Sequence, residues 1–407
     1  MHDLTLEKKV HLIQAMNRSN ILNLIRLEGP ISKRAVAKRI QVSPTTVNSI
    51  VSDLMREGFV KEKGVGYSTG GRKPVLYTFD PDVNFVIAVS LSNSSIRIAS
   101  LNLNGDIKEI KTHATEKRQG RAYIELFLNA LTLFVEHLED LSRCVGISII
   151  APGVVDAKRG VIKYNARLAL FEVGIKKLVE ETFGITTFLD NDTHSFVIAE
   201  RYFGADAYRN LLYITVGEGV GSGILVNGEI YRGHSGSSGE IGHMAVVQGG
   251  APCSCGNKGC LENYVSWPTI HSKIVSALLT QGVETSISAH IDGDFNSITP
   301  ELFVEAVEEG DPLSMQLIEE MAEYLSVAIV NAVHLLNPEA VVLSGELVQG
   351  NETLLALVRE KVSRRALPSV GANVGIHMTS LRGDIEMLGA LSVLLQEEMH
   401  VGRYSRL

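Results

Sequence analysis

The feature that most constrains this chain is a segment rich in cysteine and glycine at residues 240–262, EIGHMAVVQGGAPCSCGNKGCLE. It offers one nitrogen and three sulfurs, from His243, Cys253, Cys255 and Cys260. This ligand set suits a tetrahedral Zn²⁺, and the adjacent glycines let the chain fold back tightly on a metal. Free core cysteines beside an unrelated histidine are the alternative, but the C-x-C-G-x-x-G-C-x-E spacing is far more specific than a lone cysteine pair. We expect one structural zinc per chain, which would also fix the neighbouring Glu240 and Glu262.

The remaining cysteine and the N-terminal residues bear on the cellular compartment. Cys144 stands alone, and no apolar run approaches the roughly 18 residues that would indicate a membrane span. The first ten residues, MHDLTLEKKV, lack the apolar core of a signal peptide. We therefore expect a cytoplasmic protein without membrane insertion, in which clustered cysteines are metal ligands before they are disulfides.

Charge is unevenly distributed along the 407 residues, a length that allows two or three domains. Residues 1–80 contain 13 Lys/Arg and 7 Asp/Glu, a balance of +6; since the whole chain carries −8, the rest carries −14. A basic head on an acidic body fits a head that meets a polyanion, and chance asymmetry between solvated surfaces fits equally well. The motifs within residues 1–80 decide between them.

Residues 1–80 have the pattern of a helix-turn-helix. Apolar spacing predicts a helix over residues 5–28, which Gly29-Pro30 ends. Ser32 can cap a second helix, SKRAVAKRI, and Ser43 a third, with Pro44 at its first position. In this architecture the later helix of the pair, here the third helix of the chain, lies in the major groove, where short polar side chains meet base edges and phosphates. The candidate contacts are Ser43, Thr45, Thr46, Asn48 and Ser49.

A β-hairpin wing is predicted after this helix, from FVKEKG and VLYTF around a glycine-rich basic tip. The tip, GGRKP, is similar to short elements that enter A·T-rich minor grooves, so Arg72 and Lys73 are further candidate DNA contacts. A small helical bundle used for protein contacts is the alternative. The basic charge, the polar third helix and the basic tip together favour a winged helix-turn-helix that binds DNA.

The body, residues 81–407, alternates strands and helices. Buried strands are predicted within residues 85–107, 144–151, 209–230 and 339–345, with helices near 121–141, 313–336 and 384–398. Such alternation predicts an α/β body with mixed sheets, and the length fits two sheet-centred lobes.

The E-x-G-H and C-x-C-G-x-x-G-C-x-E segments resemble the signature of the ROK family (repressors, open reading frames, sugar kinases). PGVVD at 152–156, FLDNDTHSFVIAE at 188–200 and GEGVGSG at 217–223 extend the resemblance over essentially the whole chain. It implies a two-lobed actin-like, hexokinase-like body behind a winged helix of the repressor branch. The implied domains are the head at 1–80, lobe 1 at 81–189 with a returning helix at 380–400, and lobe 2 at 190–379 with the zinc loop and sugar pocket.

The resemblance also implies which residues contact sugar. These are Asn191, Asp192, Glu240, His243 and Glu262, whose carboxylates, amide and imidazole can hydrogen-bond to sugar hydroxyls. Asp192 matches the general base of the family's kinases. His243 would bind zinc through one ring nitrogen and sugar through the other. A loop or capping aspartate is the alternative interpretation of Asp192.

The phosphate-binding side departs from the family's kinases. Their Asp-Gly-Gly-Thr turn is replaced by SLSNSS at 90–95, and Glu218 lies among the glycines of the second loop, where it would repel phosphate. The late strand ends in Ser344-Gly345-Glu346 rather than a double glycine. Phosphoryl transfer depends on positioned, neutralised phosphates, so we expect no enzymatic activity and a vestigial base at Asp192.

The resulting hypothesis is a sugar-responsive repressor of carbohydrate uptake or catabolism genes that binds sugar or sugar phosphate without consuming it. It would act on operator DNA as a homodimer, with a tetramer also compatible. An active sugar kinase with a regulatory head is one alternative. A repressor sequestered by a transporter protein is another, although Asn191, which such members of the family replace, favours a direct sugar ligand.

Overall fold

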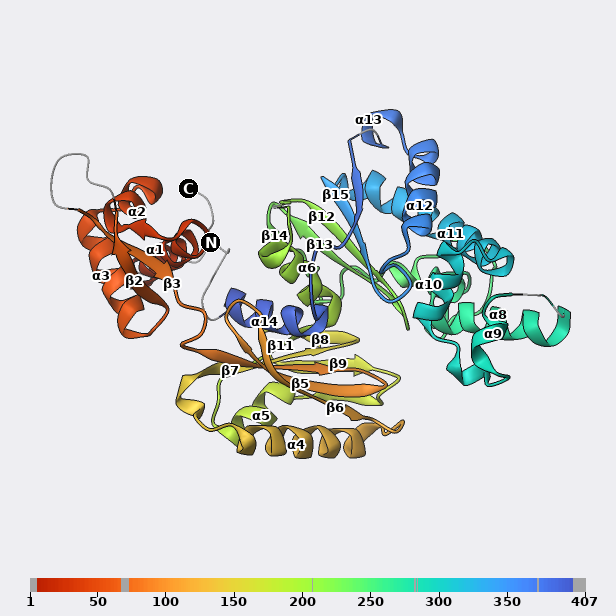
Figure 1. Cartoon of the computed structure of the whole chain (residues 1–407), viewed down its shortest axis with the longest axis horizontal. Coiled ribbons are helices and arrows are strands. Elements are labelled where there is room, and N and C mark those ends of the chain that lie inside the picture. The colour runs from red at the N-terminus through yellow and green to blue at the C-terminus, as the bar shows by residue number, and fades with distance from the viewer. Residues whose placement is uncertain are drawn as a thin grey trace. The chain divides into compact units, whose positions relative to one another are not determined.

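The computed structural model describes residues 6–397 apart from 67–72, 207, 282, 284 and 372, with side-chain environments from residue 14 onward. The chain divides into two compact units. Unit 1 contains Met1–Ser195 and Asp384–Leu407, and unit 2 contains Phe196–Gly383. Figure 1 shows the elements of both units.

The head in unit 1 is a three-helix cluster with a small sheet. Its helices are α1 (Leu6–Glu28), α2 (Lys33–Ile40) and α3 (Pro44–Arg56). Both predicted caps are present, since Ser32 Oγ accepts from Ala35 N at 3.2 Å and Ser43 Oγ accepts from Thr46 N at 3.1 Å. Val36, Val47 and Leu54 are buried between the helices. The helix-turn-helix predicted from the sequence is therefore confirmed.

The wing follows α3 and consists of β2 (Val60–Val65) and β3 (Val75–Phe79) in antiparallel pairing. A short strand that the sequence analysis missed, β1 (Ile31–Ser32), pairs with β3 on its other side, which makes the sheet order β1-β3-β2. Most of the predicted basic tip, including Arg72, lies outside the described residues.

The segment that joins the head to the lobe is hydrogen-bonded on both sides. On the head side, Asp80 N donates to Phe59 O at 3.0 Å and Asn84 Nδ2 to Glu57 O at 3.3 Å. On the lobe side, the Arg143 guanidinium donates to the carbonyls of Asp82, at 2.6 Å, and Val83. These bonds fix the joining segment to both neighbours.

The lobe in unit 1 is built on a five-stranded sheet of order β11-β7-β4-β5-β6. The strands are β4 (Phe85–Leu91), β5 (Ser95–Asn102), β6 (Ile107–Ala114), β7 (Cys144–Ala151) and β11 (Thr187–Asn191). Helices α4 (Gly120–His137) and α5 (Ile175–Phe183) cover one face, and α14 (Ile385–Glu397) covers the other (Figure 1). Alternating apolar side chains such as Ile87, Val89 and Ile98 pack against Phe127 and Leu131 of α4.

A second small sheet lies after β7, in the order β10-β9-β8. Its strands are β8 (Val154–Asp156), β9 (Val161–Asn165) and β10 (Leu170–Val173). A one-turn 3₁₀ segment, Leu141–Arg143, precedes β7. Helix α6 (Asp192–Phe203) begins directly after β11 and continues from unit 1 into unit 2.

Unit 2 is built on a five-stranded sheet of order β14-β13-β12-β15-β16. The strands are β12 (Leu211–Val216), β13 (Val220–Val226), β14 (Glu229–Ile230), β15 (Ala340–Ser344) and β16 (Gly375–Met378). Its helices are α7 (Glu262–Val265), α8 (Trp267–Gln281), α9 (Ser288–Ile291), α10 (Pro300–Glu308), α11 (Pro312–Leu336), α12 (Glu352–Arg365) and α13 (Pro368–Gly371). The 3₁₀ turns are Ile241–His243 and Phe295–Ser297. A large core packs α8, α10, α11 and α12 against this sheet.

The unit boundaries fall at 195/196 and 383/384, whereas the sequence placed the lobe boundaries at 189/190 and 379/380. The first difference arises because β11 runs into α6 without a loop, so no turn residue marks the crossing. One consequence is that Asn191 and Asp192 belong to unit 1, with the strand that carries them.

Candidate functional sites

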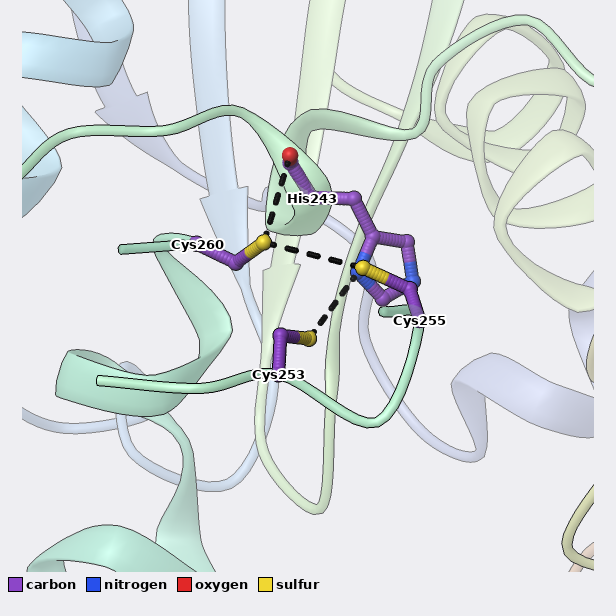
Figure 2. A group of neighbouring side chains, drawn as sticks. All are labelled: His243, Cys253, Cys255 and Cys260. Atoms are coloured by element: carbon purple, nitrogen blue, oxygen red, sulfur yellow. Dashed lines mark hydrogen bonds between the residues drawn. The ribbon is translucent and has the colours of Figure 1, made fainter. Parts of the chain in front are cut away.

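The histidine and three cysteines singled out in the sequence come together in unit 2 (Figure 2). His243 ends the short 3₁₀ turn Ile241–His243, and the cysteines lie on the loop that leads into α7. Gly259, at φ +76°, permits the tight return of this loop, because a Cβ there would lie 1.8 Å from the Val247 carbonyl oxygen. The return brings Cys260 into bridge pairing with Ala245, two residues after the histidine.

The spacing of the four ligand atoms fits a tetrahedral metal. All lie within 4.8 Å of one another, with His243 Nδ1 3.7 Å from Cys253 Sγ and Cys255 Sγ 3.7 Å from Cys260 Sγ. Zn–S bonds of about 2.3 Å produce edges of about 3.8 Å in a regular tetrahedron. Nδ1 is the ring nitrogen directed at the sulfurs, which leaves Nε2 as the nitrogen for a second contact.

The pKa values of two thiols in the cluster are shifted, in opposite directions. Burial, and then the neighbouring sulfurs of Cys253 and Cys255, raise the pKa of the Cys260 thiol to about 12. The exposed Cys255 has a lowered pKa, chiefly because the Asn257 backbone N–H bonds to it. Since a metal binds thiolate, cation binding would remove the proton that burial retains on Cys260.

Two of the predicted sugar residues lie in unit 1, at the carboxyl end of β11. Asn191 ends the strand, and its side chain donates to Gly153 O at 3.1 Å and accepts from His194 N at 3.0 Å. The amide orientation is therefore fixed by the protein, and each amide atom keeps a second hydrogen-bonding position that a hydroxyl can use.

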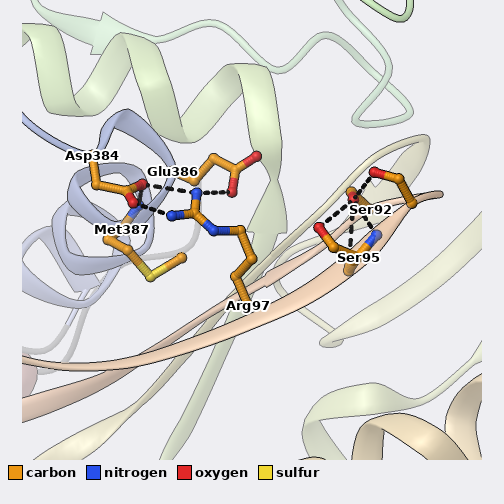
Figure 3. A network of polar contacts seen from close by, with 7 residues as sticks. Ser92, Ser95, Arg97, Asp384, Glu386 and Met387 are labelled. Carbon is orange, nitrogen blue, oxygen red and sulfur yellow. Dashed lines mark hydrogen bonds and ion pairs between the residues drawn. The ribbon is translucent and has the colours of Figure 1, made fainter. Parts of the chain in front are cut away.

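Asp192 opens α6 next to Asn191. Its Oδ1 accepts from Thr193 N at 2.7 Å. Desolvation raises the pKa of this carboxyl, against the lowering effect of the Thr193 hydrogen bonds, and the Glu386 carboxylate raises it further. The Arg97 guanidinium pairs with Glu386 at 2.7 Å and with Asp384 at the start of α14 (Figure 3).

The turn that would hold phosphate in a kinase of this fold is closed by hydrogen bonds within the protein, although Asn93 Oδ1 is buried without a partner among the described residues. Between β4 and β5, Ser92 Oγ accepts from Ser95 N at 3.0 Å and donates to Ser95 O at 3.0 Å (Figure 3). Tyr123 donates to Ser92 O at 3.0 Å, and Thr115 donates to the carbonyls of Asn93 and Ser94. Where a kinase has a magnesium-binding aspartate, this turn therefore presents serine hydroxyls and carbonyl oxygens that already accept hydrogen bonds.

The remaining predicted sugar residues, Glu240, His243 and Glu262, lie in unit 2. Glu240 is exposed just before the 3₁₀ turn, and Glu262 opens α7 and accepts from Val220 N at 3.1 Å. His243 is half-buried. The structure thus brings Asn191 next to Asp192 in one unit and places the other three in the second unit, within or directly beside the segment that carries Cys253, Cys255 and Cys260.

Carboxylates surround the glycine-rich turn between β12 and β13. The turn is tight, with Gly217 N donating to Gly219 O at 3.0 Å. A Cβ on Gly219 would lie 3.1 Å from Glu262 Oε2, and one on Gly217 would lie 3.5 Å from Glu346 Oε2. With Glu218 in the turn itself, three carboxylates lie in or beside this turn.

The predicted DNA contacts follow the outer side of α3. Thr45, Asn48 and Ser49 are exposed, as is Lys73 at the wing. Ser43 is exposed, but its hydroxyl caps the helix and lies 2.8 Å from the hydroxyl of the half-buried Thr46. Arg72 lies outside the described residues.

Lys33 is a cation beside this surface that the sequence analysis missed. Its Nζ donates to Asn48 Oδ1 at 2.8 Å and lies 4.9 Å from the centre of the Tyr77 ring. It therefore joins the start of α2 to both α3 and the wing. The signal that could have found it is its position as the first residue after the Ser32 cap, because the first helix of such a motif crosses the phosphate backbone.

Known protein families and individual proteins match this chain over most of its length. The ROK family profile matches residues 86–397, and a profile described as winged helix-turn-helix DNA-binding matches residues 17–61. The xylose repressor of Caldicellulosiruptor bescii is 28% identical over 398 residues, covering 97% of this chain and 99% of that protein. The DNA-binding transcriptional dual regulator NagC of Escherichia coli is 29% identical over 374 residues, covering 91% and 90%.

Solved structures share the fold. A ROK family transcriptional regulator, described as a homologue of the E. coli MLC protein, superposes with a TM-score of 0.83 at 23% identity, covering 96% of this chain and 97% of its own. A ROK glucokinase from Streptomyces griseus, in complex with glucose and AMPPNP, has a TM-score of 0.66 at 24% identity, covering 76% and 98%. Among the described residues, no helix is both long and apolar enough to cross a membrane. With a profile match across most of its length, this chain belongs to the ROK family.

Proposed function

We propose that this protein is a sugar-responsive transcriptional repressor of carbohydrate uptake or catabolism genes. The observation that carries the proposal is the union, in one chain, of a winged helix-turn-helix and a ROK body whose first phosphate-side turn has no Asp or Gly and whose second is flanked by carboxylates. Relatives that match over nine-tenths of the chain are named as repressors or transcriptional regulators. The proposed place of action is the cytoplasm, where the operator DNA lies.

The head binds operator DNA in this proposal. The exposed Thr45, Asn48 and Ser49 of α3 read base edges, and Ser43, Thr46, Arg72 and Lys73 are further contacts to the groove and backbone. Lys33 adds a phosphate contact next to Asn48. A homodimer supplies two heads, which a two-fold operator with matched half-sites requires.

A sugar or sugar phosphate is the proposed effector, bound by Asn191, Asp192, Glu240, His243 and Glu262. A fixed set of amide, carboxylate and imidazole groups discriminates sugars by leaving the wrong hydroxyl arrangement unpaired. Binding shifts the population of the repressor away from its DNA-competent form.

The protein binds sugar without phosphorylating it in this account. Phosphoryl transfer requires neutralised phosphates in line with the acceptor hydroxyl. The Ser92 turn offers no carboxylate for magnesium, and Glu218, Glu262 and Glu346 at the glycine-rich turn oppose a nucleotide's charge. Asp192 retains the position of the family's general base, so the kinase alternative is tested directly by ADP formation with Mg-ATP and sugar.

The metal that fits the Cys₃His cluster is Zn²⁺, with His243, Cys253, Cys255 and Cys260 as its ligands. Three thiolates and one imidazole fill a tetrahedral shell, so the ion's proposed role is structural. It fixes the loop that carries His243 and leads into Glu262, and thereby orients two of the proposed sugar contacts.

The experiment is fluorescence anisotropy of the full chain on DNA from upstream of its own and neighbouring genes. The titrants are D-xylose, N-acetylglucosamine, other pentoses and hexoses, and their phosphates. Specific binding released by one sugar supports the proposal and identifies the effector. Specific binding that no sugar changes favours sequestration by a transporter protein, and the absence of specific binding contradicts the proposal.

A further inference from the structure

Strand β6 is the edge of the unit 1 sheet, since among the described residues it pairs only with β5 (Figure 1). The pairing is regular from Glu109 to Ala114, and a bulge interrupts it beside Lys108. Most of the strand is exposed, including Ile107 at 38% and Ile110 at 37%. An exposed edge of this length carries outward N–H and C=O groups that another strand can pair with.

The charges on β6 have a symmetric arrangement around Ile110. Glu109 and Lys111 flank it, project on the same face of the sheet, and form an ion pair at 3.2 Å. They lie opposite Ser100 and Ile98 of β5, and Ile98 is in the core beneath α4, so this face is the one that α4 covers. A glutamate and a lysine equally distant from one residue become mutual partners when the strand meets an antiparallel copy of itself.

We propose that β6 is a dimerisation strand that pairs antiparallel with β6 of a second copy, with the two Ile110 residues opposite each other. In this register Glu109 lies opposite the partner's Lys111, and Lys111 lies opposite the partner's Glu109. The four charges form a square in which every neighbour has the opposite sign. Directly opposed pairs of this kind stabilise antiparallel strands, whereas like charges at the same positions destabilise them.

The surface next to β6 also favours pairing with a second copy of the chain. Between β6 and α4 lies a groove of about 230 Å³ with a partly apolar floor. Its lining residues are Glu109, Lys111, His113, Ala130, Leu133, Phe134 and His137. Leu133 is 66% exposed at this groove. A two-fold axis perpendicular to the sheet places the α4 helices of both copies on the same face of the joined sheet. The Leu133 side chains of the two copies then lie on either side of the paired β6 strands, where association covers part of their apolar surface.

The charge pattern also selects a second copy over other strands. Edge lysines and bulges are devices by which proteins prevent indiscriminate strand pairing, and β6 has both, in Lys108, Lys111 and the bulge. An arbitrary strand places no carboxylate opposite Lys111, which then has only Glu109 of its own strand, whereas a second β6 supplies a further complementary carboxylate across the interface. The same features that exclude foreign strands therefore permit self-association.

The test uses charge reversal in the full chain, measured by sedimentation equilibrium. Glu109→Lys places four lysines in the square and Lys111→Glu places four glutamates, so each single variant should raise the dimer Kd about tenfold or more. An equimolar mixture of the two should form a heterodimer of near wild-type affinity, because every opposed pair is again Lys–Glu. The matched control is Lys108→Glu, which lies opposite the partner's neutral Thr112 in this register and should dimerise like wild type.

Rescue in the mixture distinguishes pairing from a general loss of stability, since a misfolded chain is not restored by its complement. Three outcomes overturn the proposal: a monomeric wild type, single variants that dimerise normally, or single variants that the mixture does not rescue. The inference deepens the homodimer of the proposed function, but its test uses neither DNA nor sugar. If the β6 pairing fails this test, the DNA and sugar measurements are unaffected. If those measurements contradict the proposed function, the β6 pairing can still hold.

Discussion

At the scale of single residues, the clustering of His243 with the three cysteines was the feature that the sequence predicted best. Four ligands within about twenty residues define a cluster without knowledge of the fold, because the loop that joins them is local. The structure adds that His243 Nδ1 and the sulfurs lie at tetrahedral separations. The sequence located SLSNSS and Glu218, but it could not supply the Tyr123 hydrogen bond to the Ser92 turn or the approach of Glu262 and Glu346 to the glycine-rich turn, because these depend on contacts between distant segments.

Cys255→Ser should remove the zinc and destabilise unit 2. A serine hydroxyl is a poor ligand for Zn²⁺, and the remaining groups would leave the shell incomplete. Elemental analysis should show zinc falling from about one per chain to near zero, and the melting temperature should fall by about 5 °C or more.

The control for that variant is Cys144→Ser, on β7 and remote in sequence from the cluster. This variant should retain zinc. Because Cys144 is half-buried, the substitution should lower the melting temperature only slightly. Full zinc content in Cys255→Ser would contradict the assigned ligand set.

Asp192→Asn should stabilise the protein at neutral pH while weakening its binding of sugar. Desolvation raises the pKa of the folded-state carboxyl, so its stabilising contribution is complete below the ordinary pKa and is lost as pH rises through the raised value. Asparagine stays neutral, so the variant should melt a few degrees higher at pH 7.5 and show no advantage near pH 3.5, as followed by thermal unfolding.

Asp140→Asn is the matched control, because hydrogen bonds from Ser142 lower the pKa of the Asp140 carboxyl, which is exposed. Its stabilising contribution is present above the ordinary pKa, so the substitution should give no gain at pH 7.5. Equal melting temperatures for Asp192→Asn and wild type at both pH values would show that burial does not penalise this carboxylate.

At the scale of elements, long helices and capped starts were predictable, and short strands were not. The Ser32 and Ser43 caps are encoded in residues adjacent to the helices they begin. Strand β1 has two residues and exists only because the wing folds back to pair Ile31 with Tyr77. The β8–β10 sheet escaped notice because β8 is three residues long and Ala169, near β10, has a positive φ, which no local pattern indicates.

The segment that joins head and lobe makes a prediction at this scale. Arg143 holds it through the carbonyls of Asp82 and Val83, immediately before β7. Arg143→Ala should loosen the segment, so limited proteolysis should cleave between head and lobe about tenfold faster, in proportion to the population of the open form. Arg121→Ala, which removes an exposed ion pair to Glu125, should cleave like wild type. Equal rates in the two variants would mean that Arg143 does not restrain the segment.

At the scale of the whole molecule, the charge division and the domain order were both visible in the sequence. A head with a net charge of +6 precedes a body with −14. The profile matches give the same order, a winged helix at residues 17–61 followed by a ROK body at residues 86–397. The identity of the effector was not predictable, because it depends on the placement of hydroxyl-binding groups from segments far apart in sequence.

The most direct test of the account is the reciprocity of sugar and operator binding. Calorimetric titration of the releasing sugar should be run on the free protein and on the protein saturated with operator DNA. Linkage requires operator to weaken the sugar's affinity by the same factor by which sugar weakens the operator's, on the order of 5- to 150-fold. Equal factors from the two directions are the predicted result. Sugar affinity that operator leaves unchanged would contradict the claim that this protein senses sugar through its DNA-bound state.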